Sequence, residues 1–286
     1  MTSFRFFVVK LLIAGYVVTA STFGAVEMAE SQITSNVLLR VKRIQVGAAS
    51  GTIFTIEVDK RQYLITAKHV VAALKDKDKA ALCEGKKCAE IPVTVLRCAD
   101  PIDIAVLVPE LQQTISFPLE PELKGAVFGQ DMFFLGYPYA DNSLVTNVGE
   151  QTVAFIRKAT FSAQQRSDEA TVLYLDGRNN PGFSGGPIIF RDINQAGLVL
   201  KVAGVVSGFR HELGDVYKPE PIEAAQIKPE DWALGHIVRG ANGQYSRLNP
   251  TGDVVKVNTD IVVGYAIDHA VELIRKNKAQ GPLVKE

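Results

Sequence analysis

Short runs of β-branched and aromatic residues, separated by polar turns, dominate the pattern of this chain. Such runs are typical of strands, and many short strands with regular turns favour an all-β sandwich or barrel. The expected strands fall in two groups. The first group comprises Val37 to Gln45, Ile53 to Val58, Tyr63 to Thr66, Ile91 to Leu96 and Ile104 to Val108. The second group comprises Met132 to Gly136, Gln151 to Arg157, Val172 to Leu175, Pro187 to Phe190, Leu198 to Val206 and Ile261 to Ile267.

Two segments favour helices, and one long segment fits neither element. Val71 to Asp76 predicts a short helix, and His269 to Lys278 predicts a closing helix because its apolar residues recur at helical spacing. The stretch of about 210–257 is polar, is rich in proline and glycine, and holds the single tryptophan, Trp232. Loops of this length are uncommon and usually functional. Two interpretations stay open: a cover over a neighbouring cleft, or a surface insertion.

Ser184 stands between glycines in the sequence NPGFSGGP, residues 180–187. A serine in such a turn can act as a nucleophile while its own amide helps to bind an oxyanion. The G-x-S-x-G spacing also fits a nucleophile elbow, which needs a strand-to-helix turn and a downstream aspartate and histidine. Pro187 suits a helix poorly, and the apolar residues after it are typical of a strand. The downstream Asp260 and His269 would have to complete that alternative.

The residues upstream of Ser184 fit another class of enzyme. His69 follows an apolar run in TAKHV (66–70), and Asp103 opens another in DIAVL (103–107). In the order His, Asp, Ser, these motifs resemble those of the chymotrypsin-like (trypsin-fold) serine peptidases, in particular bacterial HtrA-like members of the trypsin-2 type. The likeness covers about residues 36 to 280, apart from the polar insertion. It implies an all-β fold of two six-stranded antiparallel Greek-key β-barrels with a C-terminal helix and an active site between the barrels.

The resemblance also implies a role for each residue. Ser184 would be the nucleophile, His69 its general base, and Asp103 the group that orients the imidazole. The amides of Gly182 and Ser184 would form the oxyanion hole. Asp100 is a rival for Asp103, but it precedes a proline in a turn, whereas Asp103 adjoins a strand. The chemistry would proceed through an acyl-enzyme with no metal and no organic cofactor.

Phe183 departs from the family pattern. Trypsin-like zymogens carry an aspartate directly before the serine, and this aspartate pairs with a newly cut N-terminus. Phenylalanine cannot form that ion pair, so we expect a site that needs no such activation. Phe183 would either pack inward and hold the loop or lie over the cleft.

Specificity in this family depends on the pocket beside the serine, whose walls we expect at about 177–180 and 205–209. Arg178 would suit an acidic substrate side chain there, or would point to solvent. Phe209 could narrow the pocket. Substrates would pair as an extra strand along Gly204, Val205, Val206 and Ser207. The other histidines, His211, His236 and His269, lie in polar surroundings and are expected to be surface or loop residues.

Composition limits the compartment and the partners. The chain has 47% hydrophobic residues and 31 acidic against 31 basic residues, so it can bury a core and gives no reason to expect nucleic-acid or membrane-surface binding. Three cysteines without clustered histidines disfavour zinc. Cys83 and Cys88 flank a polar turn and could form a disulfide, for which Cys98 could compete.

The N-terminus predicts export. Arg5 and Lys10 precede a short apolar run that ends at Ala20, as in a signal peptide. We therefore expect a signal peptide at 1–20, an N-terminal extension at 21–35 and a peptidase domain at 36–286, with barrels at about 36–122 and 128–282. We therefore expect a periplasmic or secreted protein. The alternative is that the N-terminal segment is an uncleaved membrane anchor, which would then be the one stable membrane contact.

The sequence thus predicts an exported serine endopeptidase that acts on protein or peptide substrates. Because the chain ends soon after the closing helix, no PDZ module is expected. One alternative is a peptidase-fold binding or chaperone-like protein with little activity. Another is a serine hydrolase that cleaves esters and no proteins. The oligomeric state is left open.

Overall fold

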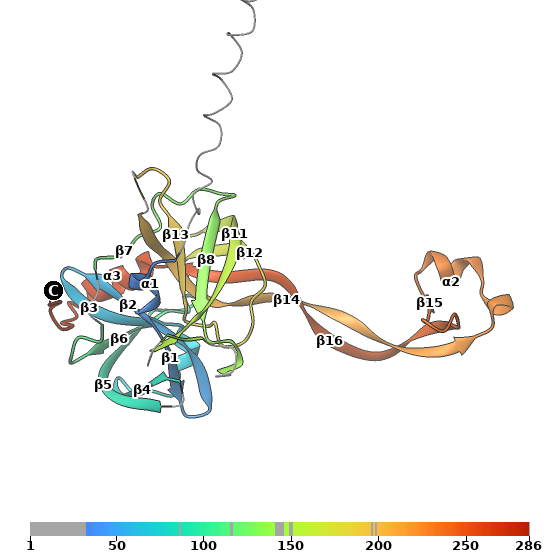
Figure 1. The fold of residues 1–286 in the computed structure, drawn as a ribbon, viewed down its shortest axis with the longest axis horizontal. Coiled ribbons are helices and arrows are strands. Elements are labelled where there is room, and N and C mark those ends of the chain that lie inside the picture. Colours follow the sequence, from blue (N-terminus) through green and yellow to red (C-terminus); the bar gives the residue numbers. More distant parts are fainter. Residues whose placement is uncertain are drawn as a thin grey trace, which may run out of the picture. The chain divides into compact units, whose positions relative to one another are not determined.

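The computed structural model describes residues 33–85, 87–114, 117–140, 146–148, 151–195, 197 and 199–285. The expected signal peptide, and most of the extension that would follow it, lie outside these residues. The described chain is mainly β-structure, as the alternation of apolar runs and turns predicts (Figure 1). Its strands form two barrels, a long two-stranded ribbon and a small β-hairpin.

The first barrel is a closed ring of six antiparallel strands in the order β1-β2-β3-β6-β5-β4. Because β4 lies beside β1, the order is that of a Greek key. Two expectations needed correction here. The run from Val37 begins as a short helix, α1, and β4 was missed because charged residues fill its exposed positions. The strands are β1 (Val41–Val46), β2 (Ala49–Val58), β3 (Arg61–Thr66), β4 (Lys77–Glu84), β5 (Lys87–Arg97) and β6 (Ala105–Pro109), with α1 at Ser35–Leu38.

The second barrel is closed by the pairing of β14 with β16, which completes a ring in the order β16-β12-β11-β8-β13-β14. All six strands are antiparallel, and β13 lies beside β8, again as in a Greek key. Two antiparallel six-stranded barrels and the closing helix α3 (Asp268–Lys276) are therefore confirmed. The strands are β8 (Asp131–Gly136), β11 (Phe155–Arg166), β12 (Thr171–Asp176), β13 (Pro187–Arg191), β14 (Leu200–Ile222) and β16 (Tyr245–Ala266).

The smaller elements lie around the barrels. The strand β7 (Glu120–Pro121) pairs parallel with β14, and β9 (Thr146–Val148) forms a hairpin with β10 (Gln151–Val153). A 3₁₀ turn, η1 (Lys68–Val71), follows β3, whereas the short helix was expected later, at Val71 to Asp76. A second 3₁₀ turn, η2 (Pro138–Ala140), follows β8.

Each barrel has a hydrophobic cluster of its own, and a third cluster spans both barrels. Phe54 and Val106 of the first barrel belong to the same buried cluster as Leu135 and Val205 of the second. Helix α3 adds Ile274 to this cluster. Apolar burial on this scale stabilises the fold by about 25 cal/mol per Å², so the barrels are packed against each other and hold the segments between them in place.

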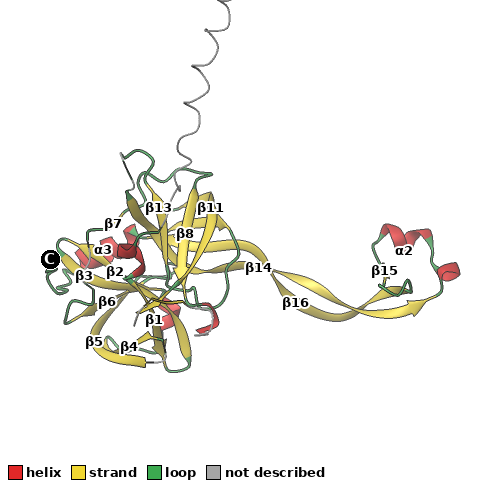
Figure 2. Cartoon of the chain, in the orientation of Figure 1, coloured by secondary structure: helices red, strands yellow, loops and turns green. Residues whose placement is uncertain are grey.

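The segment of about 210–257 is not a loop but a continuation of β14 and β16 into a two-stranded ribbon (Figures 1 and 2). His211 pairs with Asn258 near its base and Ile222 with Tyr245 near its end. The end carries η4 (Ala224–Gln226), α2 (Pro229–Ala233) and β15 (Ile237–Arg239). Most of the ribbon's side chains are exposed on both faces, so its sequence lacks the apolar alternation of a strand with one buried face.

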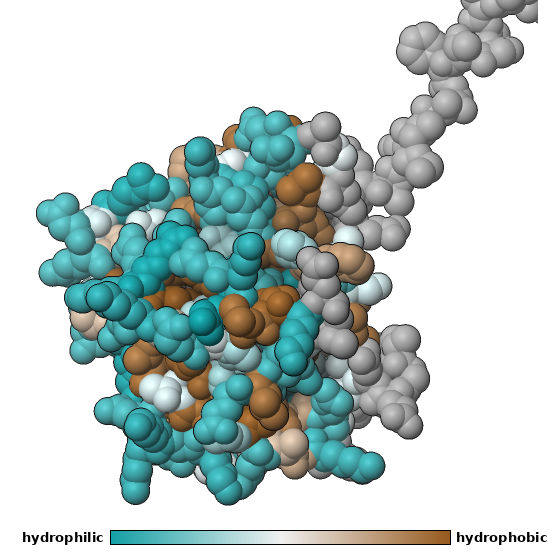
Figure 3. All heavy atoms as spheres, turned by 90° about the vertical axis from the view of Figure 1, so that its left-hand side faces the viewer, coloured by the Kyte–Doolittle hydropathy of each residue, from teal (hydrophilic) through white to brown (hydrophobic). Residues whose placement is uncertain are grey.

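The surface is mainly polar on the face that carries the C-terminus, where hydrophobic side chains form small patches between hydrophilic ones (Figure 3). Within the described part of the chain, no helix has the length and apolar character needed to cross a membrane.

Candidate active site

Ser184 lies in a tight turn that leads directly into β13. Gly182 and Gly185 have backbone φ angles of +102° and +85°, a region that glycine adopts far more readily than other residues. A Cβ at Gly182 would clash with the carbonyl oxygen of Tyr137, so this turn also needs glycine for space. Because β13 begins at Pro187, the serine precedes a strand rather than a helix. This excludes the nucleophile elbow.

His69 and Asp103 face each other across neighbouring strands. His69 lies in η1, just after β3, and Asp103 lies just before β6, which pairs with β3. His69 Nδ1 is 2.7 Å from Asp103 Oδ2, and the His69 backbone N–H donates to Oδ1 at 2.9 Å. The rival Asp100 instead forms an exposed ion pair with Lys68 at 2.6 Å. The aspartate next to the strand is thus the one that contacts His69.

The Asp103 carboxylate accepts a third hydrogen bond from Ser207, whose Oγ donates to Oδ2 at 2.6 Å. Burial raises the pKa of the Asp103 carboxyl, but the hydrogen bonds from His69 and Ser207 outweigh it and hold that pKa below its usual range. The carboxylate is therefore ionised at neutral pH. The His69 side chain is 52% exposed, which leaves its ring accessible to a substrate.

The Ser184 hydroxyl donates to the carbonyl oxygen of Ser207 at 3.0 Å. Within the described residues no hydrogen bond joins Ser184 to His69. Ser207 therefore links the two halves of the site, because its backbone contacts Ser184 and its side chain contacts Asp103.

The amides of Gly182 and Ser184 have no acceptor among the described residues. The Pro181 carbonyl accepts a hydrogen bond from the Tyr139 N–H at 2.7 Å. In a trans peptide the C=O and the next N–H point in opposite directions. The Gly182 N–H is consequently directed away from Tyr139, and both amides are available to an external acceptor.

Thr52, on β2 of the first barrel, holds this turn by two hydrogen bonds. Its N–H donates to the Ser184 carbonyl at 2.8 Å, and its Oγ1 donates to the Gly182 carbonyl at 2.7 Å. The same Oγ1 accepts from the Tyr137 N–H at 3.2 Å. Thr52 could not be recognised from the sequence, because no motif indicates a side-chain hydrogen bond between segments so far apart.

Phe183 packs inward and is fully buried. Its ring lies edge-on to those of Phe134 and Phe155, with centroids 5.2 and 6.3 Å away. The Arg157 guanidinium lies 5.7 Å from the Phe183 ring centroid and also donates to Asn180 Oδ1 at 2.8 Å. Phe183 therefore packs inward and holds the loop, which is one of the two interpretations from the sequence. Residue 183 itself carries no charge.

Gly204, Val205 and Val206 lie inside the second barrel rather than at its edge. Val205, for example, pairs with Pro187 of β13 and with Tyr265 of β16. Val206 exchanges backbone hydrogen bonds with the turn residues 185 and 186. The edge that a substrate strand could use therefore starts at Ser207, not at Gly204.

Comparison with known proteins identifies the family of this chain. The family model for the trypsin-like peptidase domain matches residues 49–198. The chain belongs to the trypsin-like peptidase family. It is therefore a serine-type endopeptidase, and its substrates are peptides. No curated protein sequence matches it.

Solved structures resemble this trypsin-like peptidase in fold. A serine-to-alanine variant of the HtrA-type protease AlgW with a tripeptide has a TM-score of 0.50 and 15% identity, over 85% of this chain and 61% of that chain. The Rv3671c protease from M. tuberculosis in its active form has a TM-score of 0.49 and 18% identity, over 87% of each chain. The MamO protease domain from Magnetospirillum magneticum has a TM-score of 0.40 and 13% identity, over 76% of this chain and 95% of that chain.

Arg178 of the trypsin-like peptidase is exposed and lines a pocket next to the Ser184 turn. Asn180 and Pro181 form part of the same wall, and Phe209 lies on the opposite side. His211 and Lys256, from the base of the ribbon, also line the pocket. Neither was expected in the site from the sequence, because both belong to the polar insertion.

The other two histidines differ in their surroundings. His269 is half-buried, and its Nε2 accepts the Thr171 N–H at 2.9 Å, so the expectation of an ordinary surface residue was wrong. It does not contact Ser184, and neither does Asp260, whose N–H bonds to the side chain of Asn258. His236 packs against Tyr217 on the ribbon.

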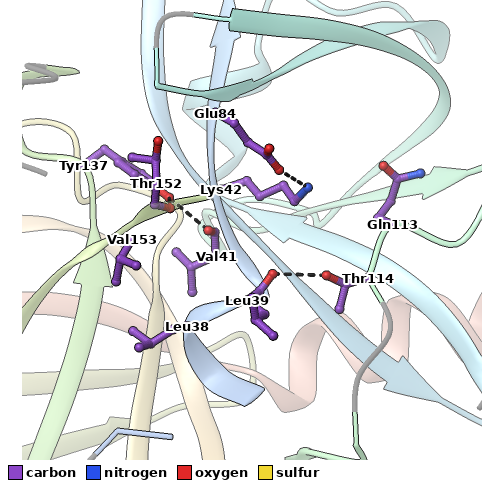
Figure 4. Close-up of a pocket in the computed structure, with 10 residues that line it drawn as sticks. All are labelled: Leu38, Leu39, Val41, Lys42, Glu84, Gln113, Thr114, Tyr137, Thr152 and Val153. Atoms are coloured by element: carbon purple, nitrogen blue, oxygen red, sulfur yellow. Dashed lines mark hydrogen bonds and ion pairs between the residues drawn. The ribbon is translucent and has the colours of Figure 1, made fainter. Parts of the chain in front are cut away.

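A second pocket of the trypsin-like peptidase, of about 360 Å³, lies beside β1 and is drawn in Figure 4. It is spanned by the Lys42–Glu84 ion pair at 2.8 Å, and the Tyr137 hydroxyl donates to the Val41 carbonyl at 3.0 Å. None of the residues predicted for the site lines it.

Among the described residues, no cluster of histidine, cysteine, aspartate and glutamate could hold a metal ion. Cys83 and Cys88 form a disulfide, and Cys98 is a buried free thiol.

Proposed function

We propose that Ser184, His69 and Asp103 form the catalytic triad with which this endopeptidase cleaves peptide bonds. The observation that carries the proposal is the two-point contact of Asp103 with His69, at 2.7 and 2.9 Å. This contact fixes the imidazole orientation and leaves Nε2 free to take a proton. Ser207 connects the pair to Ser184, so all three residues belong to one hydrogen-bonded cluster.

In the proposed reaction, His69 accepts the Ser184 proton as Oγ attacks the substrate carbonyl carbon. Collapse of the tetrahedral intermediate breaks the C–N bond, and His69 returns the proton to the leaving amine. Water then attacks the acyl-enzyme with His69 again as base, which releases the acid product and restores Ser184. The Ser184 hydroxyl must first turn from Ser207 towards His69, in keeping with catalytic hydrogen bonds that tighten when substrate binds.

The amides of Gly182 and Ser184 would bind the oxyanion of the intermediate. Their lack of any described acceptor supports this role, as does the Tyr139 bond that orients the Pro181–Gly182 peptide. Loss of one such donor typically slows catalysis about 10²–10³-fold. Thr52 would act as a positioning residue, because it holds the carbonyls of both oxyanion residues.

The main chain of the substrate would pair with the segment from Ser207 to Phe209. Gly208 and Phe209 pair with Val263 and Val262 of β16 on one side. No described strand pairs with them on the other side. Pairing there adds a strand to the sheet and brings the scissile bond to Ser184.

We further propose that the enzyme is exported. The basic and apolar N-terminal residues, with Ala20 at the end of the run, support a signal peptide. The Cys83–Cys88 disulfide supports an oxidising compartment. Retention of the segment would give a membrane-anchored enzyme instead.

The alternative of a binding or chaperone-like role rests on the Ser184 hydroxyl, which bonds to Ser207 rather than to His69. One experiment separates the two. The full-length chain is incubated with fluorescein-labelled casein at neutral pH, beside the Ser184→Ala and His69→Ala variants. We expect acid-soluble fluorescence from the unaltered chain alone. Equal casein binding by all three forms, with no cleavage, would favour the binding role, and cleavage of an ester with no cleavage of casein would favour the hydrolase.

A further inference from the structure

A pocket of about 470 Å³ lies between the Ser184 turn and the base of the ribbon. One wall is the segment just before Gly182. The other wall is formed by the part of β14 that follows Ser207 and by the part of β16 beside it. This position makes it the place for the side chain of the substrate residue whose carbonyl reaches Gly182 and Ser184. The residues that line it include Arg178, Asn179, Gly208, His211, Lys256 and Asn258.

Hydrogen bonds fix the walls of the pocket relative to each other. Asn179 is buried, and its Nδ2 donates to the Gly208 carbonyl of β14 at 2.8 Å. Asn258 Nδ2 of β16 donates to the Asn179 carbonyl at 2.8 Å. The loop that bears Arg178 is thus tied to both strands of the ribbon base, and the pocket is held in shape without a substrate.

The charge of the pocket is of one sign. Arg178, His211 and Lys256 line it, and no described aspartate or glutamate does. None of these three side chains has a hydrogen bond or ion pair in the part of the chain that the structure describes. Three basic residues from separate segments therefore line one pocket without an acidic partner, and the other lining residues are uncharged.

We propose that this pocket binds the side-chain carboxylate of a glutamate or aspartate on the acyl side of the scissile bond. The inference rests on the proposed function, because it assigns the substrate class of the same site. The Arg178 guanidinium and the Lys256 ammonium donate charge-assisted hydrogen bonds to carboxylates, and the His211 ring can donate a further N–H hydrogen bond. Because these side chains are exposed, each pair contributes modestly, and we expect a preference of about tenfold over a neutral isostere.

The ribbon gains a role from this arrangement. His211 and Lys256 lie on its paired strands near the barrel, so two of the three basic groups come from the insertion. The insertion is then neither a cover over the cleft nor a mere surface addition: its base forms a wall of the substrate pocket.

Binding is tested without catalysis in the full-length Ser184→Ala chain. Two fluorescein-labelled tetrapeptide amides are compared by anisotropy, identical except for a final glutamate or glutamine. We expect the glutamate peptide to bind about tenfold more tightly, and the ratio to fall as salt is raised. Adding Arg178→Gln and Lys256→Gln should bring the ratio close to one. Lys218→Gln is the matched control, because Lys218 is exposed on the same ribbon but does not line the pocket, and it should leave the ratio unchanged.

Equal affinity for the two peptides, or a ratio that survives loss of Arg178 and Lys256, would overturn the proposal. Cleavage kinetics of the unaltered chain distinguish failure of the pocket proposal from failure of the triad proposal. Peptide anilides ending in glutamate, glutamine, leucine or lysine are compared by kcat/KM. Faster cleavage after leucine or lysine would contradict the acidic pocket and keep the triad. A glutamate preference in binding with no cleavage of any peptide would keep the pocket and reject the triad.

Discussion

Thr52 of the first barrel donates a hydrogen bond of 2.7 Å from Oγ1 to the carbonyl of Gly182, in the turn of the second barrel that carries Ser184. Each barrel therefore supplies part of the proposed site: His69 and Asp103 come from the first, and Ser184 from the second. The Thr52 bond spans the junction between them. It joins the turn that carries Ser184 to the barrel that carries His69 and Asp103.

Replacement of Thr52 by valine should mainly lower kcat. Valine has a similar shape but leaves the Gly182 carbonyl and the Tyr137 N–H without their partner. We expect kcat to fall about tenfold, equivalent to about 1.4 kcal/mol of barrier, with KM within twofold. Loss of the two bonds should lower the free energy of unfolding by about 1–3 kcal/mol. Thr52→Ser retains the hydroxyl and should recover kcat; an unchanged kcat in Thr52→Val would show that the bond does not position the turn.

Truncation of Phe183 should test the inward packing of the turn. Its ring is fully buried among Phe134, Phe155 and Arg157, so Phe183→Ala should lower the free energy of unfolding by about 3–5 kcal/mol. Phe155→Ala is the matched control, because Phe155 touches the same ring but is 37% exposed, and it should cost clearly less. Urea denaturation measures both. Equal losses in the two variants would contradict the packing role of Phe183.

The choice between Asp103 and Asp100 can be tested directly. Asp103→Asn removes the carboxylate that fixes the His69 tautomer, and kcat should fall by about 10³–10⁴-fold. Asp100→Asn should leave kcat unchanged, since the Asp100 side chain is 96% exposed and pairs with Lys68 rather than with His69. Steady-state rates on a peptide anilide provide the comparison. A large loss in Asp100→Asn, or a small one in Asp103→Asn, would reverse the assignment.

His269 should make folding stability depend on pH. Burial lowers the pKa of His269, and the carboxylates of Glu272 and Asp268 offset this only in part. As pH falls below the ordinary value of about 6.5, the unfolded chain binds a proton at this position before the folded chain does. The stabilising contribution is therefore complete above the unfolded-state pKa and is lost as pH falls through the folded-state pKa.

The corresponding measurement is the free energy of unfolding of the unaltered chain and of His269→Ala between pH 5 and pH 7.5. The unaltered chain should lose stability relative to the variant as pH falls, because the protonated imidazole can no longer accept the Thr171 N–H. A difference that stays constant across this range would show that His269 is not linked to folding in this way.

The strands on either side of the candidate site could be predicted from local patterns, because the run before His69 and the run after Asp103 are both apolar. The two barrels and the pairing of His69 with Asp103 were implied by the resemblance to the serine peptidases, since no local pattern says which strands become neighbours. In the structure these two strands are direct neighbours, and their adjacent ends bring the two residues together. The turn at Ser184 is a local feature, since its glycines and proline define it.

Other features depend on long-range packing and could not be predicted. The run from Gly204 to Val206 is continuously apolar, and such a run does not reveal where a strand stops being paired on both sides. The ribbon was hidden because strands exposed on both faces have polar sequences. His211 and Lys256 reach the pocket only because β14 and β16 pair near its wall.

Activation of Ser184 by His69 and by the amides of Gly182 and Ser184 can be measured with a fluorophosphonate probe, which reacts with activated serines. The full-length chain is labelled at neutral pH beside Ser184→Ala and His69→Ala, and mass spectrometry locates the adduct. We expect a single adduct on Ser184, no labelling of Ser184→Ala, and labelling of His69→Ala that is slower by about 100-fold or more. A folded chain that takes up no probe, or that labels equally well without Ser184, would contradict the proposed activation.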